Sequence, residues 1–202
     1  MAPIDLNNLE DRKITKNDMR ARLDLTDKAD VEKLFEAAYA VKARHVGKKV
    51  YFRGIIEFSN VCRKNCFYCG IRKDNQNLTR YSMGLNEIVE SARWAYDAGY
   101  GSVILQSGER RGRAFTEFIE DAIKGIKEAT SGGLGITLSV GEQDEQTYER
   151  WFGAGAHRYL LRIETSNEDL YRRLHPADHS FFKRLKCLET LSAIGYQTGT
   201  GS

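Results

Sequence analysis

The sequence predicts a parallel α/β fold in which short strands alternate with helices. Short apolar runs alternate along the chain with stretches in which apolar residues recur at three- and four-residue steps, the period of an amphipathic helix. Glycines such as Gly47, Gly99 and Gly195 follow the helical stretches and stop them. Strands alternating with helices of about 10–15 residues are typical of parallel sheets built from right-handed crossovers.

The expected elements follow one another from Lys28 to the end of the chain. The first is an amphipathic helix over residues 28–46, preceded by a polar peripheral arm over residues 1 to about 27. Strands are expected at residues 50–58, 102–106, 136–140, 159–163 and from 196 onward, and helices at 86–98, 115–129, 144–152 and 181–194. We therefore expect a helical extension over residues 1–47 and a β/α domain over residues 48–202.

Composition limits the classes of function. With 202 residues and 41% hydrophobic content the chain can bury a sizeable core. A formal net charge of +3 is too small to favour nucleic acid or an anionic membrane as a partner. No apolar run reaches the roughly 18 residues of a membrane span. The first residues are polar and include Asp5, Glu10 and Asp11, unlike a secretory signal. These features predict a cytoplasmic, reducing location.

The cysteines give the sharpest signal. Three of the four, Cys62, Cys66 and Cys69, fall within eight residues in the pattern C-x3-C-x2-C. Thiolates are the ligands of iron–sulfur clusters, and three of them leave one iron of a cubane cluster open to a substrate. A disulfide framework fits an odd group of cysteines poorly. A zinc site would need a distant fourth ligand, from among Cys187, His157, His175 and His179.

Polar residues follow each of the expected strands. The cysteines come after the first strand, residues 106–109 after the second, and residues 162–165 close the fourth. Thr137 and Ser139 lie on the third strand, with Glu142 just after it. Because parallel α/β folds place ligand groups at the carboxyl ends of their strands, these residues are expected to share one site.

The cysteine spacing, with Tyr68 before the last cysteine, resembles the signature of the radical S-adenosylmethionine (SAM) enzymes. Longer strings are similar to the biotin synthase-like subgroup and, within it, to the maturase E family of FeFe hydrogenase. These strings are residues 53–70, 105–109, 159–165 and 195–202. The resemblance covers most of the chain, from about Val46 to the end, and departs at Ile163, where the family usually has histidine.

The resemblance also refines the expected fold. The family has a complete (β/α)8 barrel, which usually takes about 250 residues. Here the fifth strand has only begun when the sequence stops at Ser202. The resemblance therefore implies a TIM-barrel-type fold of which this chain is the N-terminal half to five-eighths. The chain is then a fragment, or a second chain supplies the missing C-terminal half.

The resemblance implies two cofactors, a 4Fe-4S cluster and SAM. Cys62, Cys66 and Cys69 match the catalytic cluster ligands, and the SAM amino and carboxylate groups would chelate the open iron. The residues implied for SAM are Tyr68 beside the adenine, Gln106, Ser107, Gly108 and Glu109 near the amino group, Glu164 at the ribose, Arg184 at the carboxylate, and Thr137 and Ser139 on the third strand. Arg158 and Arg162 match positions that hold anions, and are the implied substrate residues.

The implied activity is reductive cleavage of SAM. One electron from the reduced cluster would break the C5′–S bond and give methionine and a 5′-deoxyadenosyl radical. The implied role is maturation of the FeFe-hydrogenase active-site cluster, with a small-molecule substrate such as an organometallic iron–cysteine precursor and with ferredoxin or flavodoxin as electron donor. The alternatives are another enzyme of the subgroup, resembling biotin synthase or methylornithine synthase, and a non-catalytic metal-stabilised binding module.

Several residues also have simpler interpretations. Glu109 and Arg184, taken alone, fit solvated surface charges, and Glu164 fits a structural ion pair with Arg162. Cys187 lies among leucines in an expected helix and fits a buried small side chain. The four histidines show no metal-ligand spacing, and His175 and His179 fit ordinary loop residues.

Overall fold

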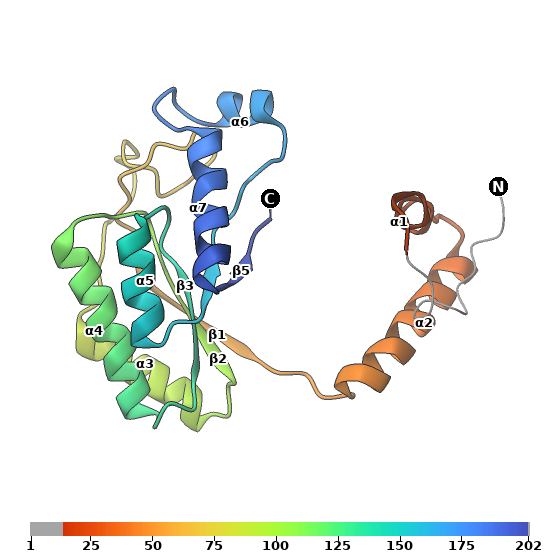
Figure 1. The fold of residues 1–202 in the computed structure, drawn as a ribbon, viewed down its shortest axis with the longest axis horizontal. Coiled ribbons are helices and arrows are strands. Elements are labelled where there is room, and N and C mark those ends of the chain that lie inside the picture. Colours follow the sequence, from red (N-terminus) through yellow and green to blue (C-terminus); the bar gives the residue numbers. More distant parts are fainter. Residues whose placement is uncertain (1–13, 202) are drawn as a thin grey trace. The chain divides into compact units, whose positions relative to one another are not determined.

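The computed structural model describes residues 14–201 and divides into two compact units between Val50 and Tyr51. Figure 1 shows the elements of both units. The expected features at residues 1–13, with Asp5, Glu10 and Asp11, lie outside the described residues, as does Ser202. The division of the chain into domains at residues 47 and 48 stays a prediction.

The first unit contains two helices, α1 (Lys16–Leu23) and α2 (Lys28–Val46). Asp27 is the N-cap residue of α2, because its side chain accepts hydrogen bonds from the free backbone N–H groups of Ala29 and Asp30. The helix expected at residues 28–46 is confirmed. Its apolar residues are not buried by the described part of this unit, and Phe35 and Tyr39 are exposed.

The second unit contains a five-stranded parallel sheet. Its strands are β1 (Arg53–Ser59), β2 (Ser102–Ser107), β3 (Gly135–Ser139), β4 (Arg158–Leu160) and β5 (Gln197–Gly199). They pair in the order β1-β2-β3-β4-β5. This sequential order is that of a barrel, whereas the order of a doubly wound sheet reverses at a switch point. The predicted α/β fold of barrel type is confirmed.

Four helices of the second unit form one layer on the sheet: α3 (Leu85–Asp97), α4 (Arg113–Ala129), α5 (Glu145–Ala154) and α7 (Phe181–Ile194). The short α6 (Glu168–Leu174) lies beyond the end of the strands and contacts α7 (Figure 1). Helix α3 packs on α4, α4 on α5, and α5 on α7 (Figure 1). Apolar side chains that these helices turn toward the sheet, such as Ile88, Ile119 and Trp151, form the core with strand residues.

The two faces of the sheet differ because strand side chains alternate. Ile56, Leu105, Leu138 and Tyr159 lie in register on neighbouring strands and are buried in the core. The residues between them lie on the opposite face. That face carries the polar residues Glu57, Gln106, Thr137, Ser139, Arg158 and Gln197. Several of the predicted site residues therefore share the face that is not part of this core.

Some element bounds differ from those predicted. The first strand begins at Arg53 rather than Val50, and the fourth ends at Leu160 rather than Ile163. The chain leaves the fourth strand early, and Glu164 then adopts a φ of 69°, which extended backbone does not use. Helix α6 was not predicted, although Asn167 caps it by accepting from the Leu170 N–H.

Within residues 14–201, no helix is long and apolar enough to cross a membrane.

The two tryptophans provide a test of the core. Trp151 is fully buried and its indole N–H donates to the Thr116 carbonyl over 2.9 Å, whereas Trp94 is 67% exposed. We expect Trp151→Ala to lower the free energy of unfolding by roughly 3–5 kcal/mol because it leaves a cavity and an unpaired carbonyl. Trp94→Ala should cost less than about 1 kcal/mol. Urea unfolding followed by circular dichroism measures both, and equal losses would contradict this packing.

Candidate functional site

The cysteine loop, residues 60–81, connects β1 to the segment before α3 and has no helix or strand of its own. All three of its cysteines are free thiols that are partly accessible to solvent. The Cys69 N–H donates to the Cys66 carbonyl, and the Phe67 N–H donates to the carbonyl of Leu174 at the end of α6. The loop therefore contains an internal turn, and a hydrogen bond connects it to a segment more than a hundred residues later in the chain.

The side chain of Arg80 contacts the cysteine loop on both sides of the three cysteines. Its Nη1 donates to the carbonyls of Asn60 and Ile71 over 2.6 and 2.9 Å, and its Nη2 donates to that of Arg72 over 2.7 Å. Asn60 precedes the first cysteine, and Ile71 and Arg72 follow the last. One guanidinium thus satisfies backbone groups that no β-ladder or helix could satisfy here.

The sulfur of Cys62 accepts two backbone hydrogen bonds, from Lys64 N–H over 3.4 Å and from Glu109 N–H over 3.3 Å. Burial raises the pKa of the Cys62 thiol, and these N–H groups oppose that rise. Burial also raises the pKa of Cys66. A bound metal would reverse this balance, because coordination deprotonates a thiol and the N–H donors favour the thiolate.

Gly108 lets the end of β2 approach the cysteine loop. A side chain there would place its Cβ 2.5 Å from both the Cβ of Cys62 and the carbonyl oxygen of Val61. Only a residue without a side chain fits at that distance, as expected where two backbones meet closely. The cysteine loop and the residues after β2 therefore form one packed site, as predicted from the strand ends.

Glu109, next in the chain, is buried, with 5% of its surface exposed. Its Oε2 accepts a hydrogen bond from the Glu142 N–H over 2.9 Å. Its Oε1 lies 3.5 Å from Arg111 Nε and 3.8 Å from Lys64 Nζ but has no hydrogen-bond partner among the described residues. Burial raises the pKa of Glu109, and Lys64 opposes that rise. The interpretation of Glu109 as a solvated surface charge is wrong.

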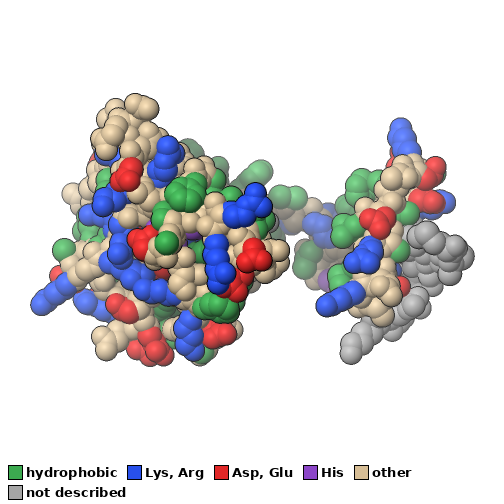
Figure 2. Space-filling view, turned by 90° about the horizontal axis from the view of Figure 1, so that it is seen from above, with side chains coloured by type: hydrophobic (Ala, Val, Ile, Leu, Met, Phe, Trp, Pro, Cys, Tyr) green, Lys and Arg blue, Asp and Glu red, His purple; other side chains and the backbone are tan. Residues whose placement is uncertain are grey.

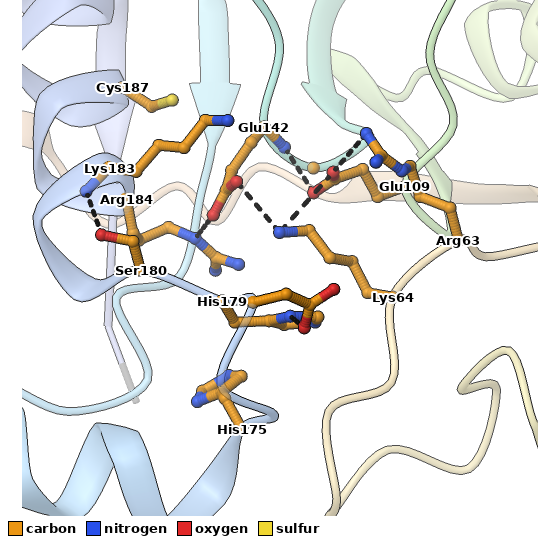
Figure 3. A network of polar contacts seen from close by, with 12 residues as sticks. Arg63, Lys64, Glu109, Glu142, His175, His179, Ser180, Lys183, Arg184 and Cys187 are labelled. Carbon is orange, nitrogen blue, oxygen red and sulfur yellow. Dashed lines mark hydrogen bonds and ion pairs between the residues drawn. The ribbon is translucent and has the colours of Figure 1, made fainter.

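Arg184, on α7, is also buried, with 6% of its surface exposed. Its Nε donates to Glu142 Oε1 over 2.6 Å, and its Nη1 donates to the Arg162 carbonyl over 2.7 Å. Burial alone would raise the pKa of Glu142, but Arg184 and Lys64 outweigh it and hold that pKa below its ordinary value. Arg184 is therefore not a solvated surface charge either. Figure 3 shows this network beside the cysteine loop.

Two histidines border the cysteine loop, and both lie in the connection between α6 and α7, as their interpretation as loop residues predicts. Both are buried. His179 Nε2 accepts from the Asn65 N–H over 3.3 Å, so its Nδ1 carries the proton and donates to Asp178. His175 Nδ1 donates to a carbonyl, which leaves its Nε2 to accept from the Tyr68 hydroxyl over 3.3 Å. Each imidazole therefore supports the loop in one defined tautomer.

The other predicted site residues lie at different depths along the strands. Gln106 donates to Glu57 on the non-core face, and Ser107 donates to the Gly108 carbonyl. Thr137 is buried within β3, and Ser139 ends that strand. Gln106, Ser107 and Ser139 therefore lie at or next to the strand ends. Thr137 lies in the middle of β3, in register with Ile104.

The predicted substrate residues, Arg158 and Arg162, do not contact the buried carboxylates of Glu109 and Glu142. Arg158 begins β4, at the end of the strand opposite to the cysteine loop, and donates to Gln197 over 2.7 Å. The Arg162 side chain is exposed, and only its carbonyl contacts Arg184. Among the described residues, Glu164 forms no ion pair with Arg162, which contradicts the structural-pair interpretation. Cys187 is buried in α7, as predicted.

Within the described part of the chain, no three His, Cys, Asp or Glu side chains converge as they would on a single metal ion. A cubane cluster does not require such convergence, because each thiolate binds a different iron. The three accessible thiols and the backbone N–H donors to Cys62 fit a cluster. Lys and Arg side chains gather on the surface of the second unit on this side (Figure 2), and Arg63 and Arg111 near Glu109 are partly exposed.

The fold and the cysteine loop define a barrel-type α/β protein with a candidate thiolate metal site at the carboxyl end of its sheet. Residues 56–202 match the family model described as the radical SAM superfamily, and the chain belongs to that superfamily.

Known relatives are similar over nearly the whole chain. The [FeFe] hydrogenase maturase subunit HydE of Thermotoga maritima is 48% identical over 98% of this chain and 55% of its own length. The 3-methylornithine synthase of Methanosarcina barkeri is 30% identical over 93% of this chain and 53% of its own length. A crystal structure of methylornithine synthase (PylB) matches 95% of this chain and 56% of its own with a TM-score of 0.81 and 30% identity. The chain thus spans about half the length of the relatives it matches.

Close packing at Gly108 gives a testable prediction. Gly108→Ala should push the Cys62 backbone away and lower the iron bound per chain after anaerobic reconstitution, since overpacking of this kind costs roughly 1–3 kcal/mol. Gly153→Ala, in α5, is the control, because a Cβ there meets nothing within 4 Å. Iron and sulfide analysis of both variants checks this, and equal loading would contradict the close approach.

Proposed function

We propose that the protein binds a 4Fe-4S cluster through Cys62, Cys66 and Cys69 and cleaves SAM reductively to methionine and a 5′-deoxyadenosyl radical. The observation that supports this most is the trio of accessible thiols packed against a buried acid–cation network, in a chain of the radical SAM superfamily. When bound, the reduced cluster supplies the electron for that cleavage.

The residues of the chain would bind and orient SAM. Glu109 has a buried carboxylate oxygen without a hydrogen-bond partner, which suits the ammonium of SAM. The Arg184 guanidinium would receive the carboxylate, and Glu164 the ribose hydroxyls. Tyr68, held by His175, would border the adenine. Gln106, Ser107, Gly108, Thr137 and Ser139 would complete the pocket along the strand ends.

We further propose a role in maturation of FeFe hydrogenase. Its support is the 48% identity to a protein named as the HydE maturase subunit. The substrate would be a small molecule, with an organometallic iron–cysteine precursor as the candidate, and Arg158 and Arg162 would bind its anionic groups. Ferredoxin or flavodoxin would supply electrons, in a reducing cytoplasm that keeps the thiols free.

A second candidate is another reaction of the same superfamily. The similarity to 3-methylornithine synthase at 30% identity in sequence and in a solved structure favours it over more distant members. Both candidates require the same thiols and SAM, and they differ in substrate. Turnover of each substrate by the full-length protein separates them.

The cysteines themselves give the direct test. After anaerobic reconstitution, reductant and SAM should yield 5′-deoxyadenosine, detected by chromatography. Cys66→Ala should reduce this yield at least about 100-fold, because the cluster loses a ligand. Cys187→Ala is the matched control and should retain the yield, since Cys187 is buried in α7. A cluster-loaded wild type that forms no 5′-deoxyadenosine, or a protein that holds zinc alone, would contradict the proposal.

A further inference from the structure

Glu142 connects three segments of the site, although it carries no part of the chemistry proposed above. It follows β3 after Gly141, whose φ of 81° turns the chain toward β2. A side chain at Gly141 would place its Cβ 2.6 Å from the Glu109 Cβ, so the turn requires glycine. The turn brings the Glu142 N–H onto Glu109 and leaves the Glu142 carboxylate buried, with 1% of its surface exposed.

The Glu142 carboxylate faces three cations and accepts hydrogen bonds from two of them, while Arg111 Nη2 lies 3.5 Å from its Oε2. Oε1 accepts from Arg184 Nε over 2.6 Å, and Oε2 accepts from Lys64 Nζ over 3.1 Å (Figure 3). Lys64 lies between the first two cysteines, and its backbone N–H donates to Cys62. Glu142 thus contacts a residue of the cysteine loop, a residue of α7 and, through its backbone, Glu109 after β2.

This contact determines which edge of the Arg184 guanidinium is free. Nε is occupied by Glu142, and Nη1 donates to the Arg162 carbonyl. Among residues 14–201, no group accepts a hydrogen bond from Nη2. Nη2 therefore remains for a ligand, together with the second N–H of Nη1. A planar guanidinium fixed at Nε and Nη1 can present these N–H groups to a carboxylate.

We propose that Glu142 is a positioning residue for SAM: it fixes the Arg184 guanidinium in the orientation that receives the SAM carboxylate and joins it through Lys64 to the cysteine loop. This inference depends on the proposed function. It implies that loss of the Glu142 charge weakens recognition of the carboxylate and leaves recognition of the rest of SAM intact.

Glu142→Gln tests this role, because it preserves the size of the side chain and removes its charge. In the full-length, anaerobically reconstituted protein, we expect unchanged iron per chain and a Kd for SAM raised roughly tenfold. The Kd for decarboxylated SAM, which lacks the group that Arg184 would bind, should change less than about twofold. Glu149→Gln on α5 is the control with the same change of charge, since Glu149 is exposed, and it should leave both constants unchanged.

A second pair of variants shows whether Glu142 acts through Arg184. In an Arg184→Met background, Glu142→Gln should weaken SAM binding no further, because the group that it positions is gone. If Glu142→Gln fails to fold or to load iron, Glu142→Asp, which keeps the charge, should load normally and show a smaller selective loss. Equal weakening of SAM and of its decarboxylated analogue, no weakening, or failure of both variants to load would overturn the proposal. A loaded wild type that binds neither compound would instead refute the proposed function.

Discussion

The site depends on the burial of two carboxylates, Glu109 and Glu142, at the carboxyl end of the sheet. Removing a charged group from water costs several kcal/mol unless cations and hydrogen bonds compensate. Here the cations come from separate segments: Lys64 from the cysteine loop, Arg111 after β2 and Arg184 from α7. Neutralising the acids therefore also fixes the loop that carries the thiols, and the barrel strands determine where that loop lies.

Much of the fold could be predicted from the sequence because its signals are local. The period of apolar residues predicts α7 at the bounds observed, and it places α3, α4 and α5 within one or two residues. The fourth strand is shorter than its apolar run, because residues after Leu160 leave the ladder before Glu164 turns. Helix α6 was missed because its seven residues carry too little periodicity, although Asn167 and two acidic residues mark its start.

The site was predictable only where residue type or spacing carries the signal. The cysteines follow from their spacing, and Glu109 follows from its place after a strand and from the resemblance. The role of Lys64 depends on a contact across 78 residues, and that of His179 on one across 114 residues. Contacts between residues so far apart in the chain leave no local pattern in the sequence. Glu142 was noticed at a strand end, but its contact with Arg184 becomes visible only when α7 packs against α5.

The central claim is that three thiolates leave one iron of the cluster open to SAM. Mössbauer spectroscopy of the full-length protein reconstituted with ⁵⁷Fe, recorded with and without SAM, tests it most directly. We expect SAM to change the isomer shift of one iron site and to leave the three thiolate-bound sites unchanged. A spectrum that SAM does not alter, from protein with a full complement of cluster, would contradict the claim.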